Sequence, residues 1–544
     1  MASKTQQQSM ESLPRQAAQR YTFAMTSVAV LSVTLILDVL YFRPCAPSTQ
    51  QKALGAVLIL LAVYTQAWLR EEHLYYAKMA QHGCAPIPTY PNDPLGIRYF
   101  LHTVRQIKSH TLLQQRRVQF DTFGRTFKHR AFPRPFDVVL SDEPENIKAV
   151  LSTRFDDWVI PSSRIRAFLP VLGRHSIFTV NGPEWQHHRA IMRPAFVRDQ
   201  ISDLRCFDRH VAKLIAHIPR DGRSFDLQAM FSLLTTDTIS DFMFGQSTDI
   251  LGNAPEDGLR FGRYFEVAMQ KIADRGRLGR LTTLLPDPEL DECTTFMHGF
   301  VARYIDEVKQ QNLEQALNDE SRRYSFLGEL LKSGEPDEVI RDHLMSIFTA
   351  GRDTTTSVLS YLFFELSRRP DIVTTIQEEI RDLGEADPTW EHLRNMKYLN
   401  WAIKEALRLN PPVAINARES IRDTILPTGG GPDGKSPVFI PKGSHFRYVP
   451  WIMQRREGFY GSDAEEFRPE RWESLRPTYE YVPFNAGPRI CIGQQFALTQ
   501  MAFITFRLLQ AFKKIERRDE KPPIQKLGIN LSMLYGCWVS MTPA

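Results

Sequence analysis

Two apolar runs near the start of the chain stand out from its pattern of hydrophobic and polar positions. The first, Tyr21 to Phe42, is 22 residues long, and Asp38 near its end is its one charge. As an α-helix rising about 1.5 Å per residue, this run would cover roughly the hydrocarbon thickness of a bilayer. A cleaved signal peptide is disfavoured, because the run is too long and starts too late.

The second run, Ala53 to Leu69, is at the lower limit for a membrane span, so a second transmembrane helix and an interfacial helix are both open. Two buried core helices are the less favoured reading of the two runs. Basic residues flank both, so the positive-inside rule does not set the orientation. Cys84 to Gly96 then contains four prolines and a glycine, which predicts a stiff, non-helical spacer. We expect a membrane anchor over residues 1–85, with one or two transmembrane helices, and a linker over residues 86–96.

From residue 97 to 544 the spacing of apolar positions is mainly helical. The longest helical pattern, Asp337 to Arg369, begins after Pro336 and stops at Pro370, and it would be roughly 50 Å long. Its middle reads TAGRDTTT, a polar stretch with a glycine that a buried helix would not choose without a functional reason. Strand patterns are short (RDTILP, SPVFIP and FRYVP, between residues 422 and 450). The predicted fold class is mainly α with small β-sheets.

The composition is that of a folded globular chain, with 43% hydrophobic and 24% charged residues. A net charge of +5 is mild for 544 residues. It fits a membrane surface or an acidic protein partner, and no basic tract indicates nucleic acid. The six cysteines are scattered without a CxxC pair. This spacing argues against a disulfide framework or a structural zinc site and favours a reducing compartment.

One glycine-rich stretch imitates a nucleotide-binding loop. Residues 429–436 read GGGPDGKS, which satisfies both GxGxxG and GxxxxGK[ST]. Either motif needs a helix directly after it, because the helix amino terminus binds the phosphate. Here Pro437 and a strand pattern follow instead. The stretch is better interpreted as the tip of a β-hairpin.

The segment FNAGPRICIG, Phe484 to Gly493, carries the most specific chemistry in the chain. A lone cysteine, Cys491, lies between glycines and directly before a helical run. The helix amino terminus is expected to lower the pKa of its thiol. Gly487 and Gly493 would let the backbone approach a flat cofactor and aim N–H groups at the sulfur. Arg489 offers a fixed cation to an anionic group.

This segment resembles the haem-binding motif FxxGxRxCxG of cytochromes P450, and every specified position is matched. The resemblance covers roughly residue 97 to the end. It implies that Cys491 is the axial ligand of a haem b iron, with Phe484, Gly487 and Arg489 among the cofactor-binding residues. A cytochrome P450 fold preceded by a membrane anchor is therefore expected.

Further motifs of the family follow in its order. Ala350 to Thr355 resembles the oxygen-activation segment of the long helix, which implies that Asp353 and Thr354 deliver protons on the distal side of the haem. Three more sets match by position: Glu405, Arg408 and Arg471 as a structural triad, Trp185 and Arg189 as a haem-propionate clamp, and Arg418 as a third propionate ligand.

The resemblance implies a haem-thiolate monooxygenase that inserts one oxygen atom of O2 into a hydrophobic substrate. No flavin or iron–sulfur module is visible, so NADPH would serve only through a separate reductase. The expected partners are NADPH–cytochrome P450 reductase, cytochrome b5 as a second candidate, membrane lipid and a hydrophobic small molecule. The expected location is the endoplasmic reticulum membrane, with the catalytic domain facing the cytosol.

Two other haem-protein classes compete with an oxygenase. An isomerase or dehydratase acting on a preformed peroxide would not need the Asp353–Thr354 pair, and neither would an electron carrier or sensor. Four stretches resemble the fungal alkane and fatty-acid hydroxylase branch of the family: AGRDTT, GGGPDGKSP, IFTVNGPEWQHHRAIMRPAF and CIGQQFAL. This resemblance implies a long-chain alkyl or fatty-acid substrate. Ser176, in GRHSIF where glycine is usual in that branch, puts this selectivity in doubt. Oxidation of a polyketide or terpenoid intermediate of fungal secondary metabolism is the alternative.

Overall fold

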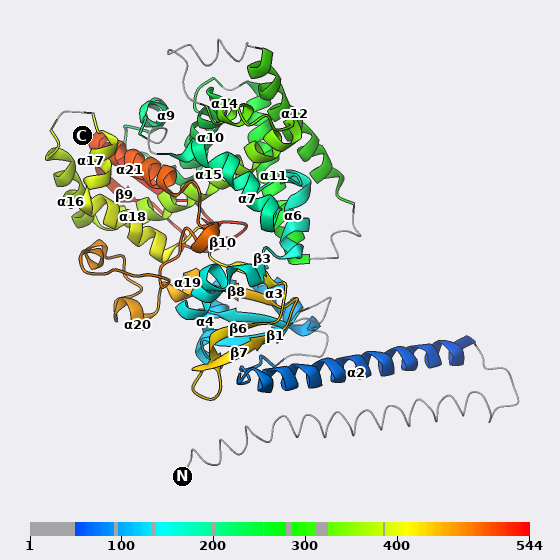
Figure 1. Cartoon of the computed structure of the whole chain (residues 1–544). Coiled ribbons are helices and arrows are strands. Elements are labelled where there is room, and N and C mark those ends of the chain that lie inside the picture. The colour runs from blue at the N-terminus through cyan, green and yellow to red at the C-terminus, as the bar shows by residue number, and fades with distance from the viewer. Residues whose placement is uncertain are drawn as a thin grey trace, which may run out of the picture. The chain divides into compact units, whose positions relative to one another are not determined.

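The computed structural model describes residues 49–91, 96–131, 137–197, 202–253, 255–278, 286–310, 325–384 and 387–544 (Figure 1). The chain divides into two compact units. One comprises Met1–Pro88 with Arg422–Lys442, and the other Thr89–Ile421 with Gly443–Ala544. The predicted span Tyr21 to Phe42 lies outside the described residues.

The first unit combines a long helix with a hairpin. The second apolar run of the sequence lies inside α2 (Thr49–Gln81), which continues beyond Leu69. No helix in the described ranges is long and apolar enough to cross a membrane. Strands β6 (Thr424–Gly430) and β7 (Ser436–Ile440) pair antiparallel. Met79, Cys84 and Phe439 form a small buried cluster between the end of α2 and this hairpin.

The hairpin tip is the GGGPDGKS stretch, and it is a turn as predicted. Gly429 N–H donates to Gly434 O at 2.8 Å, which closes the loop. Gly431 and Gly434 have φ values of 77° and 68°, a left-handed conformation that favours glycine. Strands lie on both sides and no helix follows. The interpretation as a hairpin, not a phosphate loop, is confirmed.

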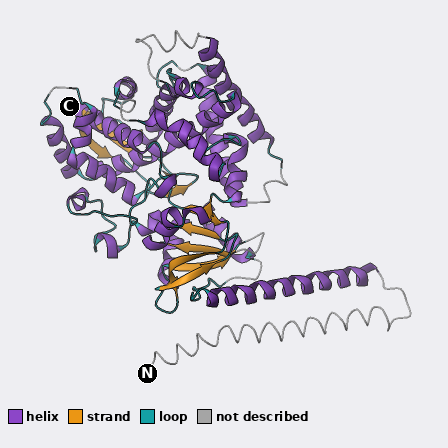
Figure 2. Ribbon diagram, viewed as in Figure 1, coloured by secondary structure: helices purple, strands orange, loops and turns teal. Residues whose placement is uncertain are grey.

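The second unit is mainly helical, which confirms the predicted fold class (Figure 2). Within the described ranges, its helices of six residues or more are α3 (Ile97–Lys108), α4 (Leu112–Phe123), α6 (Ser162–Leu172), α7 (Gly182–Met192), α9 (Arg205–His217), α10 (Leu227–Phe244), α11 (Glu256–Leu278), α12 (Pro288–Gln310), α14 (Phe326–Leu331), α15 (Asp337–Leu366), α16 (Pro370–Arg381), α17 (Trp390–Asn395), α18 (Lys397–Leu409) and α21 (Gln494–Ala511). Shorter helices are α5 (Pro144–Lys148), α19 (Pro450–Met453) and α20 (Glu457–Tyr460).

Three small sheets accompany these helices in the part of the unit that the structure describes. The largest has the order β1 (Thr126–Arg130), β2 (Asp137–Ser141), β8 (His445–Tyr448), β5 (Asn416–Ser420), β3 (Trp158–Val159), and only β2 and β8 run parallel. A second sheet joins β4 (Phe225–Asp226), β12 (Trp538–Pro543) and β9 (Phe512–Arg517). β10 (Gln525–Leu527) pairs with β11 (Leu531–Met533).

Helix α15 is the central element of this unit, and the sequence predicted its start and, within three residues, its end. It is buried along most of its length and packs against α6, α10, α12, α14, α18 and α21. At Gly351 the approach of α10 is close, since a Cβ there would lie 2.6 Å from Ile239. A side chain at this position would therefore force the Ile239 side chain to move.

Candidate active site

A cavity of about 500 Å³ lies between α15 and the Cys491 loop. Its wall is largely apolar, and α6, α7, α15, β5 and the loop before α21 contribute to it. Eight residues predicted from the sequence line it: Trp185, Arg189, Gly351, Thr354, Arg418, Phe484, Arg489 and Cys491. Gly493 also reaches the wall. Motifs far apart in the chain thus meet around one space.

Cys491 lies three residues before α21 and faces this cavity. Its N–H donates to Phe484 O at 2.9 Å, which fixes the loop. Burial raises the pKa of the thiol, while a hydrogen bond from Gly493 N–H and the charge of Arg189 act in the opposite direction. The predicted net lowering by the helix amino terminus is therefore wrong for the protein alone, because burial outweighs it.

The two glycines of the loop have different functions. Gly487 has a φ of 67°, and a Cβ on it would lie 1.8 Å from Leu151 O. It is needed for close packing of the loop on the turn Ala149–Thr153, not only for approach to a cofactor. A Cβ on Gly493 would meet Phe196 at 3.5 Å, an ordinary contact.

Five arginines line the cavity. Arg447, on β8, is one of them, and the other four also act on one another's charge. Arg489 lies 4.3 Å from the Trp185 ring and donates to Val180 O and Asn181 Oδ1, both at 3.0 Å. Arg189 donates to Ile490 O at 2.8 Å. Arg418 donates to Ala417 O at 2.8 Å, and its buried Nε has no hydrogen-bond partner.

The fourth arginine, Arg164 on α6, was not predicted. It donates to Asn416 Oδ1 at 3.0 Å. Burial and the neighbouring cations lower the pKa of Arg164 to about 10 and that of Arg489 to about 9. Within the described ranges, none of the four forms an ion pair with a carboxylate. Arg164 belongs to no spaced motif, and only the fold brings it to the cluster.

This donor set fits haem. Its two propionates would accept from guanidinium groups that are crowded and lack acidic partners, including the unpartnered Arg418 Nε. Trp185 and Phe484 supply flat apolar surface, and Cys491 would supply one soft ligand to iron. The residues present therefore match the chemistry of an anionic planar cofactor with a central metal.

The two predicted catalytic residues on α15 have different positions relative to the cavity. Thr354 lines the cavity, and its hydroxyl donates to Ala350 O at 2.6 Å. Asp353 is not part of the cavity wall. Its carboxylate accepts from Arg352 at 3.0 Å, and Arg352 also binds Glu266 on α11 at 2.8 Å. Burial raises the pKa of Asp353, although the charge of Arg352 opposes the shift.

Glu405, Arg408 and Arg471 come together away from the cavity. Glu405 and Arg408 are 0% exposed and pair at 2.8 Å, and Arg471 reaches Glu405 at 2.7 Å. Arg408 also donates to Gln454 O and Ala464 O. The group joins α18 to the chain that leads to the Cys491 loop.

Comparison with known proteins agrees with this geometry. The family model "Cytochrome P450" matches residues 91–534. The chain is 40% identical over 477 residues to Cytochrome P450 monooxygenase FPY7 of Fusarium mangiferae, covering 85% of this chain and 90% of that one. It is 39% identical over 471 residues to Cytochrome P450 monooxygenase himC of Aspergillus japonicus (85% and 84%). It is 36% identical over 485 residues to Cytochrome P450 52A13 of Debaryomyces hansenii (85% and 93%). The chain belongs to the cytochrome P450 family and is a P450 monooxygenase.

Proposed function

We propose that Cys491 is the thiolate ligand of haem b and that the enzyme hydroxylates a hydrophobic small molecule. The observation that carries this proposal is the convergence of Cys491, the four arginines and Thr354 on one cavity. Thiolate-ligated haem supplies the oxygen activation, because the thiolate donates electron density that favours O–O cleavage. Electrons come from NADPH–cytochrome P450 reductase.

The chain's own residues divide the remaining work. The arginine cluster orients the cofactor, and Gly493 N–H tempers the charge on the Cys491 sulfur. Thr354 presents a hydroxyl at the cavity wall, where it positions a proton. Asp353 acts as an outer proton source. Its raised pKa keeps the carboxyl protonated to a higher pH than usual, and it reaches the cavity only by turning away from Arg352.

The first substrate candidate is a long-chain alkyl or fatty-acid type molecule. Apolar side chains from several elements form the cavity wall above Cys491, among them Phe168, Ile177, Phe178 and Ile347. Such a wall binds an alkyl chain by burial alone, at about 0.8 kcal/mol per methylene.

A polyketide or terpenoid intermediate is the second candidate. Thr349 favours an oxygen-bearing substrate, of this kind or a fatty acid, over an unfunctionalised alkane. Thr349 on α15 lines the cavity, and its buried hydroxyl has no hydrogen-bond partner. An oxygen on a functionalised substrate would satisfy this group, whereas an unfunctionalised alkane would not. Ser176, which replaces the glycine usual in the alkane hydroxylase branch, also affects the cavity wall. It binds Ser346 on α15 at 2.7 Å and so fixes the loop that carries Ile177 and Phe178.

We further propose attachment to the endoplasmic reticulum membrane through the first apolar run, with the catalytic unit on the cytosolic side. A shared membrane would concentrate the enzyme and its reductase on one surface. The mild positive charge suits an acidic redox partner.

The test is reconstitution of the full chain with reductase and NADPH, followed by mass spectrometry across fatty acids, alkanes, polyketides and terpenoids. A product heavier by one oxygen atom is expected. Cys491→Ala should abolish both the product and the red-shifted CO-bound Soret band, whereas Cys293→Ala should keep both. A thiolate-type band in Cys491→Ala would refute the ligand assignment. Thr349→Val should raise KM for oxygenated substrates and leave KM for alkanes unchanged.

A further inference from the structure

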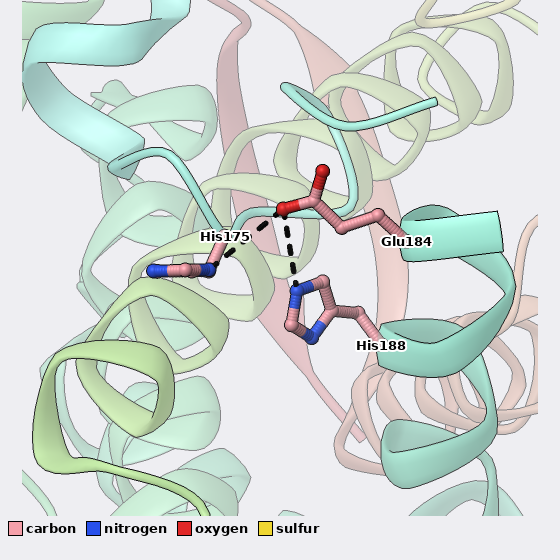
Figure 3. Close-up of side chains that lie close together, drawn as sticks. All are labelled: His175, Glu184 and His188. Carbon is pink, nitrogen blue, oxygen red and sulfur yellow. Dashed lines mark ion pairs between the residues drawn. The ribbon is translucent and has the colours of Figure 1, made fainter. Parts of the chain in front are cut away.

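A group of imidazoles and carboxylates lies outside the cavity. His175 belongs to the loop after α6, and Glu184 and His188 belong to α7 (Figure 3). None of the three is part of the cavity wall as the described residues define it. His188 lies three residues after Trp185, so the two are neighbours on α7. Trp185 and Arg189 reach the cavity wall, whereas His188 does not.

The three side chains converge on one point. His175 Nδ1 and His188 Nε2 each lie 3.9 Å from the same carboxylate oxygen, Oε1 of Glu184 (Figure 3). All three ligand atoms lie within 4.8 Å of one another. These separations are too long for direct hydrogen bonds. Tetrahedral ligation with bonds of about 2.0–2.2 Å needs donor atoms about 3.3 Å apart. Each histidine nitrogen would have to come about 0.6 Å closer to Glu184 Oε1, and the two nitrogens up to about 1.5 Å closer to each other.

A second observation points to a ligand here. His343 on α15 is 0% exposed, and neither of its ring nitrogens has a hydrogen-bond partner. The centroid of its ring lies 4.8 Å from the centroid of the His188 ring. His188 is 4% exposed, and its Nδ1 also lacks a partner. Buried polar nitrogens are nearly always satisfied by protein, water or an ion. A water molecule in the fourth position of an ion bound here would offer a partner to this group.

We propose that His175, Glu184 and His188 bind one divalent transition-metal ion, with Zn²⁺ as the fitting member of the class. Two imidazoles and one carboxylate form a set that zinc takes in proteins, with water in the fourth position.

One neighbour opposes binding and sharpens the test. Arg174 Nε lies 3.0 Å from His175 Nε2, and its side chain is 70% exposed. When His175 Nδ1 binds a metal, the neutral ring carries its proton on Nε2, so this contact must break. Because the side chain is free to swing into solvent, the contact weakens the site without blocking it.

The ion would join two elements that shape the cavity. The loop of His175 leads into Ile177 and Phe178, and α7 carries Trp185 and Arg189. His175 N–H also donates to Asp342 on α15 at 3.1 Å. A bound ion would therefore fix the loop relative to the residues that surround the cofactor, independently of the substrate.

The experiment uses the full-length, haem-loaded enzyme in detergent. The enzyme is equilibrated with Zn²⁺ and desalted, and its zinc is then measured against haem iron by elemental analysis. The expected wild-type result is about one zinc per iron, by the stoichiometry of a three-ligand site. Glu184→Gln and His175→Gln should bind at least about tenfold more weakly in competition with a zinc chelator, since even outer-shell changes cost this much. Arg174→Ala should bind at least as tightly as wild type.

His187→Gln is the matched control. His187 is adjacent on α7 but pairs with Glu335 at 2.8 Å, so its replacement should leave zinc binding intact. Glu184 is largely exposed, so Glu184→Gln should fold normally, and an unchanged Soret spectrum verifies this. The proposal is overturned if wild type holds no zinc after desalting. It is also overturned if Glu184→Gln and His187→Gln lose zinc equally, because that would indicate general surface binding.

Discussion

At the scale of single residues, the four arginines at the cavity are the most informative feature. Buried cations without acidic partners repel one another and lose their hydration, so the cluster destabilises the protein when no anion is bound. Arg418 lies in the middle of it, and its charge contributes to the lowered pKa of both Arg164 and Arg489. A structural arginine would instead be paired, as Arg408 is with Glu405.

The variant Arg418→Met distinguishes an arginine that binds the cofactor from an arginine that only stabilises the fold. Without haem, the variant should be as thermally stable as wild type or more so, because one repulsive charge is gone. With haem it should release the cofactor about tenfold faster or more, since a charge-assisted hydrogen bond contributes about 1.5–3 kcal/mol. Transfer of haem to a scavenging apoprotein measures the rate. Arg517→Met, an exposed change on β9, is the control. A less stable apoprotein with normal haem release would show that Arg418 is structural.

The two polar residues of α15 make a second prediction at this scale. Thr354→Ala should bind haem and accept electrons but form hydrogen peroxide in place of product, because the hydroxyl at the cavity wall is lost. Asp353→Asn should slow the whole cycle while coupling persists. Peroxide and product per NADPH give the readout. Wild-type coupling in Thr354→Ala would mean that protons arrive by another route, with Thr355 as the nearest candidate on the cavity wall.

The pH dependence of turnover follows from the same carboxyl. Burial raises the pKa of Asp353. The carboxyl can donate a proton below that pKa, and above it the group is already deprotonated. Turnover limited by this donor should fall as pH rises through a range above that of an ordinary aspartate. Asp353→Asn, which cannot titrate, should lose that fall and stay uniformly slow. An unchanged pH profile in the variant would contradict the role of Asp353 as a donor.

At the scale of elements, the Cys491 loop depends on one backbone contact, the packing of Gly487 against Leu151 O. Gly487→Ala combines a clash with backbone at 1.8 Å and a left-handed φ, and neither can relax by rotating a side chain. We expect this variant to lose haem incorporation. Gly493→Ala, with its nearest contact at 3.5 Å, should retain it. The ratio of Soret to protein absorbance checks both, and equal behaviour of the two variants would refute the explanation.

Local elements were also what the sequence predicted best. The limits of α15 and the turn at GGGPDGKS follow from prolines, glycines and apolar spacing, all of which are local signals. The pairing of β2 with β8 was not predictable, because its strands are far apart in the chain and both are short. The residues of the site fall into the same two groups, those that local motifs predict and those that only the fold brings together. Spaced motifs identified Cys491 and Arg489, but Arg164 and Thr349 reach the cavity only through the fold.

The thiol of Cys491 shows the same limit for electrostatics. The approach of a helix amino terminus can be read from the sequence, and it predicts a lowered pKa. The degree of burial cannot be read there, and it reverses the sign. Gly351 is similar: its place in a polar segment pointed to chemistry, while its contact with Ile239 on α10 becomes visible only in three dimensions.

At the scale of the molecule, the first unit determines where the chain can be truncated. The sequence placed the anchor over residues 1–85, which predicts that this whole stretch is dispensable for folding. The last part of α2 and the residues after it hold the β6–β7 hairpin. Lys78 pairs with Asp423 at 2.6 Å, the His82 ring stacks on Phe439, and Ala85 N–H donates to Pro437 O at 2.9 Å.

Two truncated forms of the chain should therefore differ in thermal stability. Removal of residues 1–70 deletes both apolar runs and keeps every one of these contacts, whereas removal of residues 1–85 also uncovers Phe439, which is 1% exposed in the full chain. Both forms should leave the membrane fraction. Only the longer deletion should lower the thermal midpoint, because burying a phenylalanine contributes about 1.5–3 kcal/mol. Phe439→Ala in the full chain should reproduce that loss without changing membrane attachment.

Equal midpoints for the two truncations would show that residues 71–85 do not support the hairpin. Retention of the shorter deletion in membranes would place a second attachment surface beyond residue 70.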